Sequence, residues 1–84
     1  MFEVKFTPSG KKDLDRLPLD IQLRIIKKIK FFSSCDNPTV FSKPLVNLPP
    51  ATHRFRVGSY RIAFYIATKT IYVDRIGHRK EVYT

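Results

Sequence analysis

The chain of 84 residues has a composition that excludes several classes of protein. Hydrophobic residues make up 43% and aromatics 13%, which is enough for one domain over residues 1–84 and too much for a disordered chain. Sixteen Lys and Arg against seven Asp and Glu give a net charge of +9, which predicts an anionic partner. No apolar run approaches the roughly 20 residues of a membrane-spanning helix, and the first residues lack a signal-peptide pattern, so we expect a cytoplasmic protein that binds no membrane. The single cysteine excludes an internal disulfide.

The basic residues are sorted by type along the chain. Seven of the nine lysines precede residue 44, whereas five of the seven arginines follow residue 53. Arginine presents a planar fork that matches phosphate, while lysine is a mobile point charge. We therefore expect the last third to form a recognition surface and the first half to carry a solvated basic face.

The chain begins with a predicted strand and a short helix. Residues 2–6 alternate between apolar and charged side chains, which is the pattern of a strand. Thr7 and Pro8 provide a hydroxyl N-cap and a proline at the first helical position. We expect this helix over residues 8–17, with a first turn loosened by Gly10.

A second helix is predicted over residues 18–33. Pro18 interrupts the first helix, and apolar residues then recur every three to four positions. The other side of this helix is basic and contains Arg24, Lys27, Lys28 and Lys30. Two helices joined this closely should form an antiparallel hairpin. The basic side is most simply a solvated face, with contact to nucleic acid as the alternative.

Residues 34–52 contain four prolines and little periodicity. Proline is poorly tolerated inside a helix or a central strand, so this segment is predicted to be a long connection. One short apolar stretch, residues 45–48, can pin it to the rest of the protein.

The C-terminal part is predicted to form strands separated by short turns. Alternation indicates three of them, over residues 53–57, 60–66 and 71–76. In the last strand Val73 and Ile76 both suit the core although they are three positions apart. This change of phase indicates a β-bulge near Asp74 or Arg75.

The order of these elements predicts an α+β fold. The two-helix hairpin should pack on one face of a mostly antiparallel four-stranded sheet, with the order β-α-α-β-β-β. The opposite face would carry Arg54, Arg56 and Arg61, with Tyr65 beside them. Three arginines on neighbouring strands form a concentrated cationic patch.

Several catalytic arrangements are missing from the sequence. Its His, Cys, Asp and Glu residues lack the spacing of a metal site, no glycine-rich phosphate loop is present, and no nucleophile elbow supports a Ser-His-Asp triad. The remaining chemistry lies in Arg54, Arg56, Arg61, His78, Arg79 and Tyr83. Such a set suits metal-independent RNA cleavage, in which fixed guanidinium groups stabilise the charge on the phosphate. A cluster of Arg and Tyr is nevertheless more often a binding surface than an active site.

The sequence resembles toxins of the RelE/ParE superfamily, and most closely RelE-type messenger RNA interferases. The most specific pieces are Arg56-Val-Gly-Ser-Tyr-Arg61 and Gly77-His-Arg-Lys-Glu-Val-Tyr83. The opening, Val4-Lys-Phe-Thr-Pro-Ser-Gly-Lys-Lys-Asp-Leu-Asp-Arg-Leu-Pro18, is similar to their first strand and helix hairpin. The resemblance implies a RelE-like fold over nearly the whole chain except the proline-rich connection. The first piece is shared across the superfamily and supports the fold more than the activity.

What this resemblance implies is the toxin of a type II toxin–antitoxin pair. Such a toxin enters the ribosomal A site, cleaves the messenger RNA there, and is bound by an acidic antitoxin in quiescent cells. The implied RNA-binding residues are Arg54, Arg56 and Lys80. By position, Arg61 would stabilise the transition state, Arg79 would act at the scissile phosphate or leaving group, and Tyr83 would stack on or orient the nucleotide. No metal ion or other cofactor is implied, and we expect the free toxin to be a monomer.

One departure from the family pattern concerns the general base. The best-studied pattern has lysines where this chain has Arg54 and Arg56, and an arginine stays protonated. Histidine can exchange a proton near neutral pH, so we hypothesise that His78 is the base, with Tyr83 as the second choice. The alternative is that His78 only fills space or contacts phosphate.

Two other functions stay open at this point. A ParE-like toxin would have the same fold but would inhibit DNA gyrase and cleave no RNA. A basic RNA-binding module without catalysis would bind RNA in a salt-dependent way. If an acidic antitoxin is the partner, it should cover the arginine face, and the exposure of Arg54, Arg56, Arg61 and Arg79 should fall in the complex.

Overall fold

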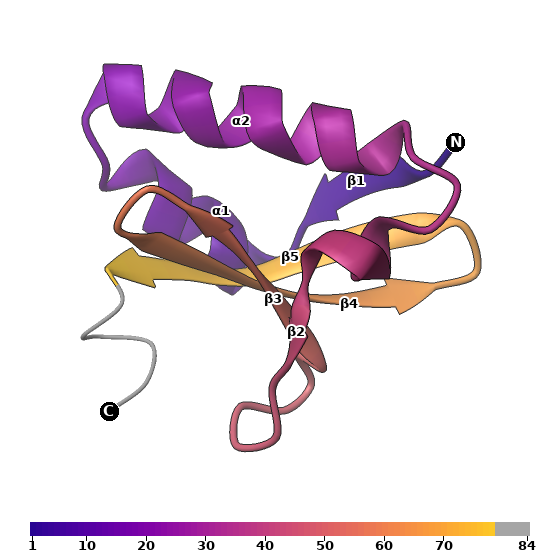
Figure 1. The fold of residues 1–84 in the computed structure, drawn as a ribbon. Helices are drawn as coiled ribbons and strands as arrows, with labels where there is room; N and C mark the ends of the chain where they lie inside the picture. Colours follow the sequence, from indigo (N-terminus) through magenta and orange to yellow (C-terminus); the bar gives the residue numbers. More distant parts are fainter. Residues whose placement is uncertain (79–84) are drawn as a thin grey trace.

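The computed structural model describes residues 1–78. Its helices and strands, in chain order, are β1 (Glu3–Phe6), α1 (Pro8–Asp15), α2 (Leu19–Ser33), the 3₁₀ helix η1 (Pro38–Phe41), β2 (Lys43–Pro44), β3 (His53–Val57), β4 (Tyr60–Ala67) and β5 (Thr70–His78). The strands form one sheet in the order β1-β5-β4-β3-β2. The pair β1–β5 is parallel and the other pairs are antiparallel. Figure 1 shows both helices on one side of this sheet, so the predicted α+β arrangement is confirmed.

One strand was not predicted. β2 has two residues and pairs with β3 at the edge of the sheet, which makes five strands rather than four. Pro44 lacks an N–H donor, and a sheet tolerates proline at its edge. Two residues are also too few for an alternating pattern to be recognised, so the sequence predicts only a connection there.

Helix α1 begins where predicted and ends at Asp15, two residues earlier than expected. The backbone N–H of Gly10 donates to Thr7 Oγ1 over 3.1 Å, which caps the first turn. The expectation that Gly10 loosens this turn is wrong, because the residue is buried against β5. A Cβ at Gly10 would lie 2.1 Å from the backbone oxygen of Val73. The glycine therefore allows α1 to lie directly on the sheet.

Helix α2 has the predicted bounds within a residue and covers the sheet with its apolar side. Ile25, Ile29 and Phe32 of this helix are buried. The ring of Phe32 stacks on Phe55 of β3 at 4.2 Å between centroids, and Phe55 stacks on Phe64 of β4 at 4.1 Å. This aromatic stack ties the helix layer to the middle strands.

The predicted bulge in β5 is confirmed. Val73 pairs with Phe64 and Arg75 pairs with Ala63, so Asp74 has no residue opposite it in β4. Asp13 of α1 accepts hydrogen bonds from the backbone N–H of Ile76, at 2.9 Å, and from Arg75 Nε, at 3.2 Å. Helix α1 therefore holds the part of β5 that follows the bulge.

The connection between α2 and β3 is folded rather than loose. Pro38 is buried, and Asn37 Oδ1 accepts a hydrogen bond from the backbone N–H of Thr39, which caps η1. After β2 the chain makes a loop that projects below the sheet, on the side away from α2 (Figure 1). The N–H of Leu45 donates to the backbone oxygen of Thr52 and closes this loop. Within residues 1–78, no helix is long and apolar enough to cross a membrane.

Candidate functional site

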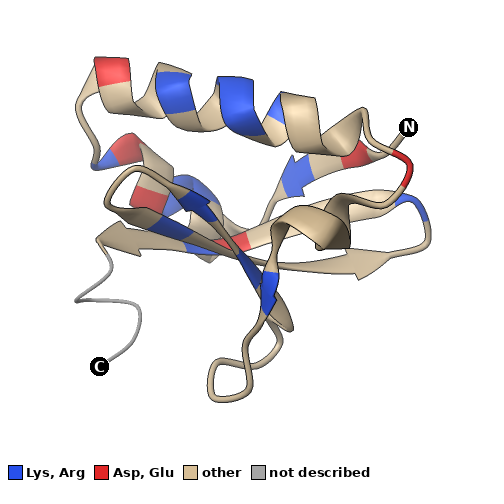
Figure 2. Ribbon diagram, viewed as in Figure 1, with Lys and Arg blue, Asp and Glu red and all other residues tan. Residues whose placement is uncertain are grey.

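Strand pairing brings four basic side chains together on β2, β3 and β4. Arg56 pairs with Arg61, and Lys43 pairs with Arg54. Paired residues of antiparallel strands share a face of the sheet. Phe55, which alternates with the two β3 arginines, packs under α2, so the four cations lie on the face away from the helices. Figure 2 shows the basic segments of β2 and β3 next to each other.

These side chains line a pocket of about 250 Å³, here called the cationic pocket. Its lining residues are Phe41, Lys43, Arg54, Arg56 and Arg61. Arg54 and Arg61 are half-buried, whereas Arg56 and Lys43 are exposed. The Nη1 atom of Arg61 is buried, which restricts the orientation of its guanidinium group. The three arginines that the sequence placed on one face thus converge on one concave site.

The electrostatics of the cationic pocket favour an anion. Within residues 1–78 its lining holds four cations and no acidic side chain. Like charges placed directly opposite each other on paired strands destabilise a sheet, and Arg56–Arg61 is such a pair. A bound phosphate would relieve this repulsion, and the fork of a guanidinium group can bind two of its oxygens.

Two residues of the cationic pocket were missed by sequence reasoning. Lys43 and Phe41 both lie in the proline-rich segment that was predicted to be a plain connection. Lys43 is the only Lys or Arg between residues 34 and 52, which was a weak signal. Phe41 carried no signal of its own, because its position depends on how η1 folds back toward β3.

The structure does not bring His78 to the cationic pocket. In the β4–β5 ladder Gly77 is opposite Arg61, and His78 is opposite Tyr60. Tyr60 packs against the core, and its ring meets that of His78 edge to face at 5.9 Å between centroids. Since successive residues of a strand point to opposite faces, His78 points to the helix side.

The remaining predicted residues lie elsewhere. Tyr65 is on the arginine side of β4 but stacks on Tyr72, at 5.1 Å between ring centroids, and does not line the cationic pocket. Arg79, Lys80 and Tyr83 lie outside the described residues. Among the described residues, no group of three or more His, Cys, Asp or Glu side chains is placed to hold a metal ion.

Residues 4–83 match the sequence family described as "ParE toxin of type II toxin-antitoxin system, parDE". The chain belongs to this toxin family. Toxin RelG of Mycobacterium tuberculosis is 30% identical to this toxin over 84 residues, which cover 98% of this chain and 95% of that protein. The RelE/ParE superfamily assignment that the sequence motifs suggested is therefore confirmed.

Solved structures of RelBE and ParDE toxin–antitoxin systems contain chains with the same fold as this toxin. The toxin–antitoxin complex RelBE2 from Mycobacterium tuberculosis contains a chain with a TM-score of 0.73 and 29% identity, covering 93% of this toxin and 98% of that chain. A chain of the chromosomal ParDE system from P. aeruginosa has a TM-score of 0.71 and 16% identity, covering 93% of this toxin and 96% of that chain. Because the two scores are nearly equal, the backbone alone does not distinguish a RelE-type from a ParE-type activity.

Proposed function

We propose that this toxin is an endoribonuclease that enters the ribosomal A site and cleaves messenger RNA there without a metal ion, which stops translation. The observation that carries this proposal is the cationic pocket. Three arginines line it, and one of them, Arg61, is half-buried, which suits a fixed group that stabilises charge on a phosphate. The names of two similar proteins, Toxin RelG and the complex RelBE2, agree with the RelE-type resemblance of the sequence motifs.

In the proposed reaction the 2′-hydroxyl of a ribose attacks the adjacent 3′-phosphate, and the 5′-oxygen leaves. Negative charge grows on the non-bridging oxygens of the phosphate, and Arg61 is the group that stabilises it. Arg54 and Arg56 hold the flanking RNA backbone, together with Lys80. Arg79 assists at the scissile phosphate or the leaving group, and Tyr83 stacks on or orients the nucleotide.

The general base of this reaction has two candidates. The sequence favours His78, but its side chain lies on the other face of the sheet from Arg61. A base must reach the proton that it removes, through a direct hydrogen bond or one water molecule. The position of His78 therefore favours the second choice, Tyr83. If His78→Gln leaves the cleavage rate unchanged across the pH range, His78 has no part in proton transfer.

We further propose that an acidic antitoxin binds this toxin and that the free toxin is a monomer. The similar toxin chain from Mycobacterium tuberculosis was solved as a toxin–antitoxin complex. A negatively charged segment over the cationic pocket would neutralise it and relieve the repulsion between Arg56 and Arg61. Arg54, Arg56, Arg61 and Arg79 should then lose solvent exposure.

Primer extension on a defined messenger RNA tests the proposed reaction. Purified toxin is added with and without ribosomes, beside Arg61→Ala and the matched control Arg24→Ala, which removes an exposed arginine of α2. We expect cuts within codons that require both ribosomes and Arg61, and that persist in the Arg24 variant. Cuts on free RNA alone would make the protein a general ribonuclease.

A second candidate function is inhibition of DNA gyrase. It is favoured by the match to a family described by the ParE toxin. This function predicts no RNA cleavage under any condition. In that case a DNA supercoiling assay with purified gyrase would show inhibition by the wild-type toxin.

A further inference from the structure

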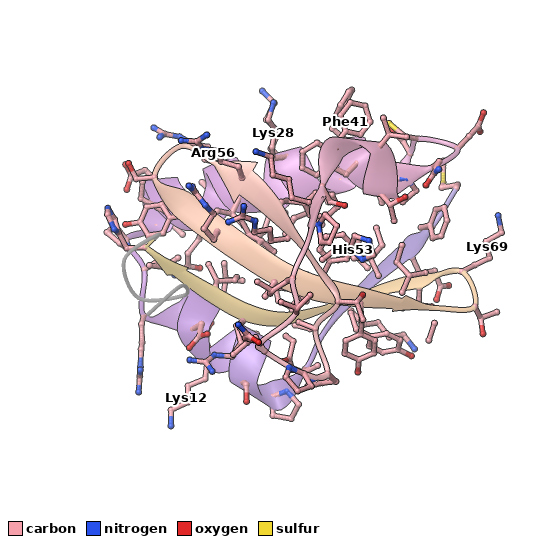
Figure 3. The ribbon with its side chains drawn as sticks, turned by 60° about the horizontal axis from the view of Figure 1, so that its bottom comes forward. Lys12, Lys28, Phe41, His53, Arg56 and Lys69 are labelled. Atoms are coloured by element: carbon pink, nitrogen blue, oxygen red, sulfur yellow. The ribbon has the colours of Figure 1, made fainter. Side chains whose placement is uncertain are left out.

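Phe41 gives the cationic pocket an aromatic wall. It is the last residue of η1, is 47% exposed, and lines the pocket with Lys43 and the three arginines. A single exposed Phe needs no explanation. An exposed aromatic ring among four cations is different, because this is the composition of sites that bind single-stranded nucleic acid. Figure 3 shows Phe41 and Arg56 along the same edge of the molecule, with Lys12 of α1 at the opposite edge.

We propose that Phe41 is a nucleobase-stacking residue, on which a base of single-stranded RNA packs while the arginines hold the adjoining phosphate. This inference rests on the proposed function and deepens it by giving the base, as well as the phosphate, a place in the site. The arginines of the pocket bind the charged backbone and supply affinity that falls with salt. A base needs a flat apolar surface, and among the lining residues Phe41 has one.

The orientation of Phe41 is fixed from behind. Its ring stacks on Phe32 at 5.3 Å between centroids with an angle of 23° between the planes. Phe32 in turn stacks on Phe55, and Phe55 on Phe64, in the core. Phe41 is thus the outermost ring of a stack that begins in the sheet, and a bound base would extend that stack. Because the ring already packs on Phe32, and the Asn37 cap and buried Pro38 hold the backbone of η1, Phe41 loses less freedom on binding than an unpacked side chain would.

Phe31 provides a matched comparison. It is 53% exposed, and its ring meets that of Phe41 edge to face at 5.8 Å. It lines a different pocket, on α2, with Arg24, Lys27 and Lys28. Lys28 Nζ already lies 5.9 Å from the centroid of the Phe31 ring, and these cations are all exposed on a helix. Phe31 therefore has similar exposure and surroundings but no half-buried arginine beside it.

The absence of tryptophan from the sequence makes the test direct. In full-length Phe41→Trp the new indole is the sole tryptophan fluorophore, and we expect a short single-stranded oligoadenylate RNA to quench its emission. Phe31→Trp should bind the same RNA with unchanged emission. An indole at position 41 that saturating RNA leaves unquenched would overturn the proposal, as would equal quenching at both positions.

Phe41→Leu and Phe41→Tyr give a second measurement, of affinity. Leucine keeps apolar contact with Phe32 but cannot stack, so we expect the dissociation constant for the RNA to rise about tenfold. The salt dependence of binding should stay the same because no charge is removed. Tyrosine should restore wild-type affinity, and Phe31→Leu should not change it.

Wild-type affinity in Phe41→Leu, with RNA still bound through Arg61, would make Phe41 a packing residue. A wild-type toxin that binds no free RNA would overturn the stacking proposal, whereas the proposed function fails only if primer extension finds no ribosome-dependent cuts.

Discussion

Two regions of this toxin carry dense positive charge and are built in different ways. The basic face of α2 consists of Arg24, Lys27 and Lys28, all exposed and spaced along one helix. The cationic pocket consists of side chains from three strands and η1, with Arg54 and Arg61 half-buried. The two regions meet where Phe31 contacts Phe41. Dense positive charge on neighbouring surfaces therefore gives two very different sites.

The difference shows what a net charge of +9 can and cannot indicate. Exposed charges on a helix stay hydrated, so they contribute little to the free energy of unfolding whether a ligand is present or absent. Like charges placed opposite each other on paired strands oppose folding, and Arg56 and Arg61 hold such positions. Local rules of stability are most often broken at functional sites. The cationic pocket is therefore the better candidate for the reaction, although the helix carries similar charge.

The largest expected effect separates the two regions by their role in cleavage. Arg61→Ala should lower the single-turnover rate on ribosome-bound messenger RNA by about 10²–10³-fold, as the loss of one fixed donor to a developing negative charge does. Arg61→Lys keeps the charge but loses the guanidinium fork, so its rate should be intermediate. Arg24→Ala should cleave like the wild type. Equal losses in the Arg24 and Arg61 variants would remove the distinction between the two regions.

The second effect concerns the packing of α1 on the sheet, at a distance from both charged regions. Gly10→Ala should lower the free energy of unfolding by about 3 kcal/mol, because its Cβ would lie 2.1 Å from the backbone oxygen of Val73. The neighbouring Ser9 is exposed on the same helix, so Ser9→Ala should change stability little. Thermal unfolding gives the change in the free energy of unfolding for both variants. A Gly10→Ala protein as stable as the wild type would show that α1 need not lie directly on β5.

The third effect concerns the bulge. Asp13→Ala removes the acceptor for the N–H of Ile76 and for Arg75, and should lower the free energy of unfolding by about 1–2 kcal/mol. Asp13→Asn keeps an oxygen that can accept the hydrogen bond from the N–H of Ile76, so its free energy of unfolding should fall less. Amide hydrogen exchange at Ile76 distinguishes a local from a global effect. Unchanged protection of Ile76 in Asp13→Ala would mean that α1 does not hold the end of β5.

Local patterns in the sequence were enough to predict most of the fold. The cap at Thr7, the break at Pro18 and the bulge at Asp74 depend on neighbouring residues, and all three are confirmed. The arginines of β3 and β4 were placed on one face because alternation fixes the face of each residue in a strand. The same rule, continued from inward-facing Ile76, would have placed His78 on the inner face as well.

Features that depend on contacts between distant segments were not predictable. Gly10 was interpreted from its helix propensity, whereas its position is decided by the close approach of Val73. The pairing of Lys43 with Arg54 and the stacking of Phe41 on Phe32 depend on how a proline-rich segment folds back. These two residues complete the cationic pocket, so the sequence indicated its charge but neither its shape nor its aromatic wall.

The smallest effect tests whether the two regions differ in binding as well as in reaction. Arg56→Ala should reduce the slope of log K against log salt for single-stranded RNA by about one, because one phosphate contact is lost. It should not lower the melting temperature, since it also removes the repulsion with Arg61. Lys28→Ala removes the same charge from the basic face of α2 and should leave the slope unchanged. If both variants reduce the slope equally, RNA contacts both regions, and the boundary at Phe31 and Phe41 does not limit the binding surface.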